Sequence, residues 1–316
     1  MTEHSEDAST TTVAATTATS RGSRPTLVVL AAGRARRYGG VKPLAPVGPA
    51  GEAVIDLLAS DALAAGFGSL VLVIGPSTGP AIRYHVEQTW PGAVDVRFAV
   101  QDAPRGTVDA ALAALAHLDP AAPFGVANAD DLYGQAGLAQ LAGHLANDGS
   151  NSLVGYQLRN AVVGDAPVTR GVCQVNPDGT LESVDERRQV CAAGDGRYLA
   201  KDGRAPEELD GDELVSMNLW GFGPDMPPIF RAAMADATEA LEAGRSDAEV
   251  LLPEIVGAIL AGRSPGGLPA APFRVLRAEG RCIGVTHPDD LSLVQADLAG
   301  QVGRGERPAQ PRGSVG

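Results

Sequence analysis

Residues 27–52 read LVVLAAGRARRYGGVKPLAPVGPAGE, an apolar run that leads into a glycine-rich loop with three arginines and a lysine. The apolar run predicts a buried β-strand, because it is continuous and stops at a glycine. In open α/β sheets, ligands bind beyond the carboxyl ends of the strands, and the loop after the first strand commonly holds phosphate. The loop is therefore either a solvated turn or a cradle for phosphate groups.

Two basic residues of this loop suit phosphate chemistry. Its glycines allow tight turns and bring backbone amides close to a ligand, while Arg37 and Lys42 can supply positive charge. Only two of the 25 basic residues are lysines, Lys42 and Lys201. An ammonium group is a compact charge that can follow a transferring phosphoryl group, whereas arginine makes fixed paired contacts. We therefore predict that Lys42 acts on phosphate.

Two familiar phosphate loops do not match this stretch. The dinucleotide-binding pattern G-x-G-x-x-G would need a glycine at Ala35. The Walker pattern would need Gly-Lys followed by Ser or Thr, which the loop does not contain. Both of those assignments are therefore disfavoured.

The chain around the loop alternates between strand-like and helix-like segments. Strand-like runs occur at 26–33, 69–75, 94–100 and 123–130, and the helix-like segments between and after them are 52–66, 78–88, 106–118 and 135–147. Such alternation predicts a mostly parallel sheet with helices on both faces.

The rhythm changes near residue 150. Four strand-like runs, 151–159, 168–175, 180–187 and 214–222, follow with little helix between them. They predict an antiparallel lobe that adds to the first sheet. Helical patterns return at 227–243, 248–261 and 287–300, with one strand at 273–279. The predicted fold class is α/β, a Rossmann-like mixed and mostly parallel sheet flanked by helices, with an inserted antiparallel lobe.

Composition limits the domain organisation and the function. Residues 1–24 and 301–316 have no apolar periodicity and predict disordered tails around one domain at 25–300. The net charge of −13 disfavours nucleic-acid binding, which needs clustered Lys and Arg. No secretory signal and no apolar run of about 18 residues are found, so we expect a cytoplasmic protein without a membrane segment.

Cysteine and histidine give no sign of a metal centre. The three cysteines, Cys173, Cys191 and Cys282, are odd in number and widely separated, which disfavours disulfides and a Cys-based metal site. None of the five histidines lies at metal-ligand spacing from another.

The acidic pair Asp130 and Asp131 ends the strand-like run at 123–130. At the carboxyl edge of a sheet, one or two carboxylates can hold Mg²⁺ together with phosphate oxygens. An aspartate before the helical pattern at 135–147 would serve equally well as a helix cap. We predict that Asp130 binds metal and that Asp131 caps the helix or supports the site.

The loop resembles the signature of the sugar-phosphate nucleotidyltransferases, the nucleotide-sugar pyrophosphorylases, whose domain is GT-A-like. That signature looks like L-A-A-G-x-G-S/T-R, a short run to a Lys near Pro, and then L-x-P-V. The resemblance implies that Arg37 and Lys42 are catalytic. It implies nucleotide contacts for the residues that match the strand end, Leu30, Ala31, Ala32 and Gly33. Two positions depart from the signature, with Ala35 for the second glycine and Arg36 for Ser or Thr.

The resemblance extends through residues 27–295. The segment QDAPRGTVDAALAAL is similar to Q-x-x-P-x-G-T-A-x-A, which implies nucleotide contacts for Gln101, Gly106 and Thr107. The segment VANADDLYG is similar to the family's magnesium-binding strand end, with Asp130 as the ligand. Substrate contacts are implied for Tyr133, Gly134, Gly171, Glu186, Arg187 and Asn218.

The second metal ligand of relatives, Asp or Asn just before the last helix, is not found at its natural alignments, Gly284 and Thr286. The nearest carboxylates are Asp289 and Asp290, which also suit a cap of the last helix. We predict Asp290 as the second ligand beside Asp130.

The resemblance implies an Mg²⁺-dependent reaction of a nucleoside triphosphate with a sugar 1-phosphate, giving a nucleotide sugar and pyrophosphate. UTP or dTTP is the family default. A cytidylyltransferase for a non-sugar alcohol phosphate, a GT-A-like glycosyltransferase and a degenerate nucleotide-binding regulator remain alternatives. The apolar face of residues 251–260 fits either the core or a homo-oligomer interface.

Overall fold

The computed structural model describes residues 24–33, 40–162, 164, 166–243, 249–285, 290–305 and 307. Arg37, Ala35 and Arg36 of the glycine-rich loop lie outside the described residues, as do Thr286 and Asp289. Of the two predicted tails, residues 1–23, 306 and 308–316 lie outside them as well.

Within the described ranges, eleven strands form one sheet. Its first half consists of β1 (Thr26–Ala31), β2 (Ser69–Ile74), β3 (Val96–Val100) and β4 (Phe124–Asn128). Strand β1 pairs in parallel with β2 and β4, and β2 pairs in parallel with β3. The predicted parallel half-sheet is therefore confirmed.

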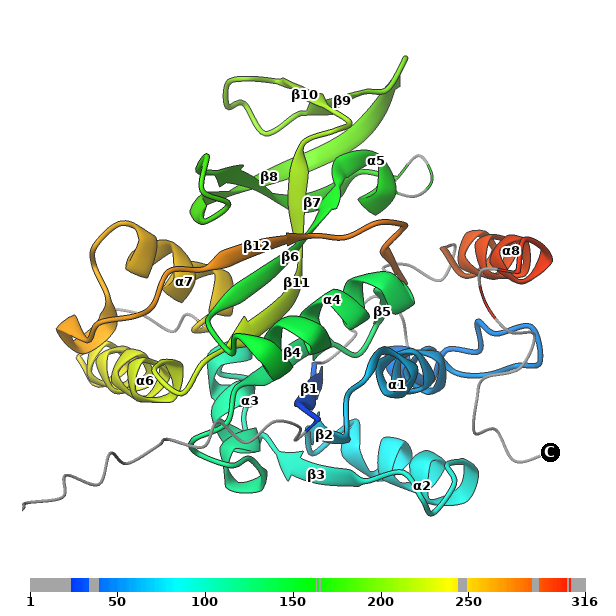
Figure 1. The fold of residues 1–316 in the computed structure, drawn as a ribbon, viewed down its shortest axis with the longest axis horizontal. Coiled ribbons are helices and arrows are strands. Elements are labelled where there is room, and N and C mark those ends of the chain that lie inside the picture. The colour runs from blue at the N-terminus through cyan, green and yellow to red at the C-terminus, as the bar shows by residue number, and fades with distance from the viewer. Residues whose placement is uncertain are drawn as a thin grey trace, which may run out of the picture.

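The second half is the lobe at the top of Figure 1. Strands β7 (Val168–Val175), β8 (Leu181–Gly194), β9 (Arg197–Ala200) and β10 (Glu208–Asp210) pair in antiparallel order. Strand β11 (Leu214–Phe222) joins the lobe to the parallel half, because it pairs antiparallel with β7 and with β4. Strand β6 (Ser152–Gln157) pairs with β11 and with β12 (Arg274–Arg277).

Helices cover both faces of the sheet, because successive side chains of β1 enter opposite cores. Leu27, Val29 and Ala31 belong to one core cluster, and Val28 belongs to the other. The first cluster is covered by α1 (Val54–Ala65), α2 (Gly79–Thr89), α4 (Gly134–Asn147) and α8 (Asp290–Gly303). The second is covered by α3 (Thr107–Ala114), α6 (Met226–Glu242) and α7 (Leu252–Leu260). The remaining short elements are α5 (Leu158–Ala161), η1 (Lys42–Leu44), η2 (Leu115–His117), η3 (Pro265–Gly267), β5 (Asp131–Leu132) and β13 (Ile283–Gly284).

Three boundaries differ from the sequence expectations. Asp131 does not cap α4, because it pairs with Gly284 in the small β5–β13 sheet and Tyr133 is the N-cap residue. Helix α7 begins at Leu252 rather than at 248, because Leu251 is extended and the backbone of Val250 pairs with Arg105 and Val108 at the start of α3. Helix α8 continues to Gly303, three residues beyond the predicted end of the domain.

The apolar face at 251–260 lies in the core of the chain. Leu252 and Val256 of α7 are fully buried in the second cluster, and Ile255 and Ile259 pack against it. Among the described helices, none is both long and apolar enough to cross a membrane.

Candidate active site

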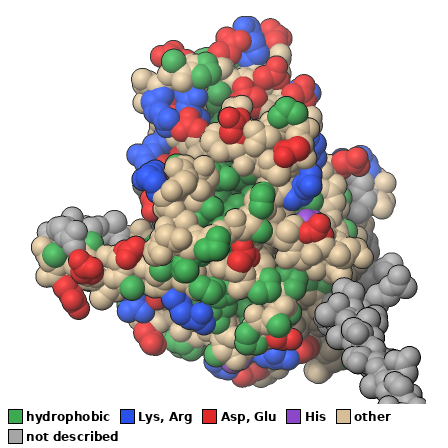
Figure 2. All heavy atoms as spheres, turned by 60° about the vertical axis from the view of Figure 1, so that its left-hand side comes forward, with side chains coloured by type: hydrophobic (Ala, Val, Ile, Leu, Met, Phe, Trp, Pro, Cys, Tyr) green, Lys and Arg blue, Asp and Glu red, His purple; other side chains and the backbone are tan. Residues whose placement is uncertain are grey.

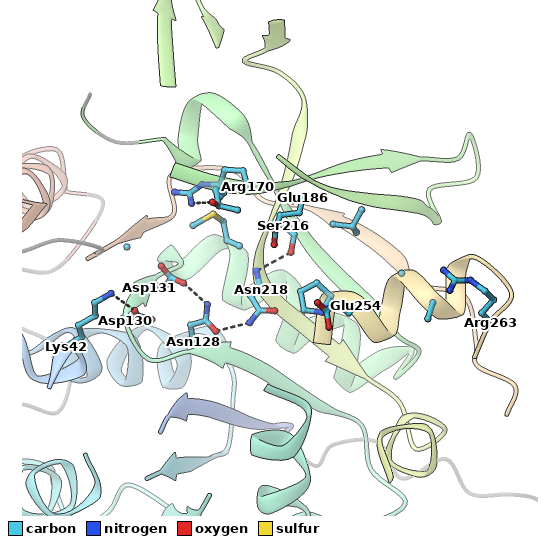
Figure 3. Close-up of a pocket in the computed structure, with 18 residues that line it drawn as sticks. Lys42, Asn128, Asp130, Asp131, Arg170, Glu186, Ser216, Asn218, Glu254 and Arg263 are labelled. Carbon is cyan, nitrogen blue, oxygen red and sulfur yellow. Dashed lines mark hydrogen bonds and ion pairs between the residues drawn. The ribbon is translucent and has the colours of Figure 1, made fainter. Parts of the chain in front are cut away.

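A cavity of about 780 Å³ opens between the carboxyl end of β4, the lobe and α7. Figure 3 shows that its polar side chains come from all three sides. The edge of β4 contributes Asn128 and Asp130, the lobe contributes Arg170 and Glu186, and α7 contributes Glu254. The cavity therefore lies where the sequence places the ligand site of an open α/β sheet.

Lys42 and Asp130 meet at one end of this cavity. Lys42 is the first residue of η1, a turn that Pro43 and the bond from Ala45 N to the Lys42 carbonyl hold in place. Its Nζ lies 3.5 Å from Asp130 Oδ2, and the two side chains are 19% and 36% exposed. The pair is thus accessible from the cavity, as a site for a charged ligand requires.

Asp131 lies beside this pair and is electrostatically strained. Burial and the adjacent negative charge of Asp130 raise the pKa of Asp131 to about 7. A hydrogen bond from Asn128 Nδ2 to Asp131 Oδ2, at 2.9 Å, and the charges of Arg170 and Lys42 oppose that rise. The edge therefore concentrates negative charge that a cation would relieve.

A chain of hydrogen bonds, the amide relay, fixes the orientation of Asp131. Trp220 Nε1 donates to Asn218 Oδ1 at 2.6 Å, and Asn218 Nδ2 donates to Asn128 Oδ1 at 2.8 Å. Asn128 Nδ2 then donates to Asp131. An indole N–H can only donate, so the oxygen of Asn218 must face Trp220 and its NH₂ group must face Asn128. Asn128 in turn presents its NH₂ group to the carboxylate.

Asn218 reaches this position because β11 bulges. Ser216 pairs with Gly155 and Trp220 pairs with Leu153, so β11 spends two residues more than β6 over the same span. Asn218 has φ 61° within that bulge, a left-handed conformation that Asn tolerates better than most residues. The bulge therefore turns one amide of a buried strand toward the cavity.

Arg170 brings positive charge to the site from the lobe. Its Nε and Nη2 donate to the Ala161 carbonyl at 2.9 and 2.6 Å, and its Nη1 donates to the Thr169 carbonyl at 2.7 Å. Burial lowers the pKa of Arg170, and the carboxylate of Asp131 opposes that shift. Arg170 therefore lies within electrostatic reach of Asp131 without a direct ion pair among the described contacts.

Helix α7 forms the opposite wall of the cavity, where Glu254 and Arg263 line it (Figure 3). Its start is tied to α3, because Leu252 N donates to Thr107 Oγ1 at 2.8 Å and Val250 pairs with the backbone of Arg105 and Val108.

Gly106 allows this close approach. It has φ 99°, and a Cβ there would lie 2.2 Å from the Val250 carbonyl oxygen. A side chain at position 106 would therefore push α7 away.

The predicted nucleotide-binding residues lie near the sheet edge but are not among the described residues that line the cavity. Leu30, Ala31, Ala32 and Gly33 form the end of β1 and the first residues after it.

The Gln101 amide supports the loop before α3, because its Nε2 donates to the Gly106 carbonyl and to Asp109. Gln101, Gly106 and Thr107 thus shape the wall next to the cavity.

The predicted substrate-binding residues separate into two groups. Gly171, Glu186 and Asn218 line the cavity. Arg187 does not, because its buried guanidinium pairs with Asp202 in the lobe and also bonds the Arg204 and Pro206 carbonyls.

Tyr133 and Gly134 also lie outside the lining. The buried Tyr133 hydroxyl donates to the Met217 carbonyl and accepts from Asn128 N, so it braces the bulge from behind. Gly134 begins α4 with φ 70°. Their contacts are structural ones.

Several lining residues were not predicted. Asn128 stands two residues before Asp130 at the end of the same strand, and this spacing is a usable signal. Arg170, Ser216, Glu254 and Arg263 reach the cavity through the tertiary arrangement of the lobe and α7, which no local pattern marks.

Two carboxylates could hold a divalent cation here. Asp130 and Asp131 both line the cavity, whereas Asp290, the first residue of α8, is not among the described lining residues. No group of three or more Asp, Glu, His or Cys in the described part of the chain could hold a metal ion. The oxygen donors fit Mg²⁺, which keeps several waters and takes one or two protein carboxylates plus phosphate oxygens.

Comparison with known proteins identifies the class. The MobA-like NTP transferase domain family matches residues 27–255, so this chain belongs to that family. By this family it is a nucleotidyltransferase. No curated protein matches the sequence at a significant level.

Two solved structures share the fold at low sequence identity. The inositol-1-phosphate CTP transferase from T. maritima is similar with a TM-score of 0.60 and 12% identity, over 90% of this chain and 98% of that one. HddC from Yersinia pseudotuberculosis is similar with a TM-score of 0.54 and 16% identity, over 87% of this chain and 99% of that one.

The amide relay predicts the effect of Asn218→Asp. The new carboxylate still accepts from Trp220 and tolerates the left-handed backbone, but it cannot donate to Asn128. We expect the free energy of unfolding in urea to fall by about 1–3 kcal/mol, the cost of an unsatisfied buried polar group. Asn147→Asp on the exposed face of α4 is the matched control and should change it by less than about 0.5 kcal/mol. Equal effects of the two substitutions would contradict the relay.

The raised pKa of Asp131 predicts a pH-dependent stability difference. Because the folded pKa is about 7 and the ordinary value is 3.8, this carboxyl stabilises the fold at low pH and loses that contribution as pH rises through 7. Asp131→Asn should therefore gain stability relative to wild type between pH 5 and pH 8. A gain on the order of 1 kcal/mol corresponds to about 2–4 °C in Tm.

The measurement is thermal unfolding in EDTA at the two pH values. Asp119→Asn, at an exposed loop position, should show no such gain. A Tm difference between Asp131→Asn and wild type that is the same at pH 5 and pH 8 would refute the assignment.

Proposed function

We propose that the chain transfers a nucleotidyl group from a nucleoside triphosphate to a sugar 1-phosphate, giving a nucleotide sugar and pyrophosphate. The observation that supports this most is the contact between Lys42 and Asp130 at the carboxyl edge of β4, open to the cavity. It joins a cation for phosphate to a carboxylate for metal, and the family is one of nucleotidyltransferases.

The chemistry needs no protein nucleophile. A phosphate oxygen of the acceptor is already ionised at neutral pH and attacks the α-phosphorus in line with the departing pyrophosphate. Lys42 stabilises charge at the α-phosphate, and Arg37 of the glycine-rich loop binds the leaving pyrophosphate. Mg²⁺ held at Asp130 would neutralise phosphate charge as a Lewis acid when bound.

The nucleotide is proposed to bind at the end of β1 and the adjoining wall. Backbone groups of Leu30, Ala31, Ala32 and Gly33 would face the triphosphate. At Gly33 a Cβ would meet no atom of the described residues within 4 Å, which leaves room for a ligand beside the backbone. Gln101, Gly106 and Thr107 would frame the base.

The rest of the cavity suits a hydroxyl-rich acceptor. Glu186 and Glu254 can accept hydrogen bonds from hydroxyl groups on opposite sides. Gly171 and Val184 both line the cavity, and a Cβ at position 171 would lie 2.8 Å from Val184 Cγ1, so a side chain there would disturb this wall. The phosphate of such an acceptor would lie toward Lys42 and Arg170.

A cytidylyltransferase acting on a non-sugar alcohol phosphate is the second candidate. The fold neighbour from T. maritima is an inositol-1-phosphate CTP transferase. Our preference for UTP or dTTP rests on the sequence resemblance alone. The cavity chemistry serves either acceptor, because both carry a phosphate and several hydroxyls.

The surface supports small-molecule rather than nucleic-acid partners. On the face shown in Figure 2, Lys and Arg side chains are interspersed with Asp and Glu. With a net charge of −13, such a surface gives weak attraction for polynucleotides. We further propose a cytoplasmic site of action, where nucleoside triphosphates are available. We also propose that the chain forms a homo-oligomer, which its mass in solution would test.

A pyrophosphate-release screen tests the function. Five nucleoside triphosphates are assayed with Mg²⁺ against panels of sugar 1-phosphates and alcohol phosphates. Turnover with a sugar 1-phosphate supports the first candidate, and turnover only with CTP and an alcohol phosphate supports the second. Nucleotide binding without pyrophosphate release across the panel would favour a regulatory protein and contradict the proposal.

With the substrate pair so identified, Lys42→Ala should lower kcat by about 10²–10³, because a single charge that stabilises the transition state is lost. Lys201→Ala removes the only other lysine, an exposed one in the lobe, and should leave kcat unchanged. Wild-type turnover by Lys42→Ala would show that the lysine has been assigned the wrong role.

A further inference from the structure

Gly284 and Asp131 are paired residues of the small β5–β13 sheet at the end of the cavity. A Cβ at position 284 would lie 2.3 Å from Asp131 Oδ1, far inside any real contact distance. The backbone conformation at Gly284 is not a left-handed one, so the packing of the carboxylate is the feature that a side chain there would disturb. The Asp131 carboxylate thus fills the space beside β13 that a side chain from position 284 would need.

This position matters because it is one of the two, with Thr286, at which the sequence resemblance expects a second metal ligand. A ligand from the segment before the last helix would approach the site from β13. Here the carboxylate comes from β5 instead, and Gly284, the residue of β13 that pairs with Asp131, carries no side chain.

Asp131 and Asp130 have unused capacity to accept ligands. An ionised carboxylate offers about four lone-pair positions. Among the described contacts, Asp131 accepts one normal hydrogen bond, from Asn128, while the Tyr133 hydroxyl, whose proton goes to the Met217 carbonyl, lies 3.5 Å from Asp131 Oδ2. The corresponding contact of Asp130 is the 3.5 Å approach of Lys42. Both carboxylates line the cavity.

The amide relay prevents Asp131 from turning away. Trp220 is fully buried, and rings of Phe222 and Phe273 lie about it at centroid distances of 6.1 and 6.2 Å. It therefore anchors Asn218, which anchors Asn128, which holds Asp131 Oδ2. A carboxylate held from behind by a rigid chain is preorganised for a ligand in front.

We propose that Asp131, rather than Asp290, is the second carboxylate of the divalent-cation site, and that Gly284 is required so that the carboxylate can occupy that place. This inference rests on the proposed function, because the metal is implied by nucleotidyl transfer. It assigns the site to two consecutive residues of one strand end, with Asn128 as the positioning residue of Asp131.

The test is a titration of the purified full chain with Mn²⁺ in the absence of nucleotide. Electron paramagnetic resonance measures the free Mn²⁺ and so gives the Kd. Wild type should bind Mn²⁺, and Asp131→Asn should raise the Kd on the order of 10–100-fold, as loss of a partner at a metal site does. Asp130→Asn should do the same. Asp290→Asn, which alters the rival carboxylate, should bind like wild type.

Gly284→Ala provides a variant in which both carboxylates are retained. Its added Cβ should displace Asp131 and weaken Mn²⁺ binding, while circular dichroism shows a folded chain. Wild-type affinity in Asp131→Asn or in Gly284→Ala would overturn the proposal. Equal weakening in Asp290→Asn and Asp131→Asn, or no Mn²⁺ binding by wild type, would also overturn it.

The readout separates this inference from the proposed function. Mn²⁺ binding that depends on Asp131, without pyrophosphate release from any substrate pair, would leave the metal site standing and remove the reaction. Pyrophosphate release by wild type, together with Mn²⁺ binding that Asp131→Asn leaves unchanged, would support the reaction and remove Asp131 from the metal site.

Discussion

Strand β11 is the element on which both the fold and the site depend. Strand β6 pairs with it at both of its ends, so β4 and β7 must share its other edge. Pairing with β4 involves Trp220–Phe222, and pairing with β7 involves Val215 and Ser216. Between them, residues 217–219 bulge and pair with neither strand. The cavity opens at this gap. Strand β11 therefore connects the parallel half of the sheet to the lobe, and its bulge leaves the space between them.

The bulge also explains the distribution of charge. It turns Asn218 toward Asn128. Because the Trp220 indole donates to Asn218, Asn218 donates to Asn128, and Asn128 donates to the Asp131 carboxylate at the sheet edge. Two adjacent carboxylates are thereby kept at the cavity, with Lys42 beside one and Arg170 beyond the other. Two adjacent carboxylates repel each other, and a divalent cation bound between them and phosphate oxygens would lower that electrostatic repulsion.

The sequence predicted the regular elements well and the site in part. The bounds of β7 and β11 match the strand-like runs 168–175 and 214–222, because the turn-forming residues Asn176 and Gly223 follow directly after them. Lys42 and Asp130 could be paired in advance, since the family signature and the strand-end rule both mark this edge. The two-residue strands β5 and β13 were beyond reach, because two residues carry no periodicity.

Side-chain direction was the other limit. Arg170 and Arg187 are partners across β7 and β8, and the sequence resemblance implied a substrate contact for Arg187 alone of these two. The sequence favoured Arg187. Its guanidinium, however, pairs with Asp202 and donates to loop carbonyls, and Arg170 is the arginine that lines the cavity. The choice depends on the Asp202 loop folding back over β8, a tertiary contact that no local pattern reveals.

The central claim is that the strand end at Asp130 is where metal and phosphate meet. The most direct measurement is an anomalous difference map from crystals of the full chain soaked with MnCl₂ and inorganic pyrophosphate. The account predicts one manganese peak at about 2.0–2.3 Å from carboxylate oxygens of Asp130 and Asp131, with pyrophosphate toward Lys42. A manganese peak bound elsewhere on the chain, with none at Asp130, would contradict it.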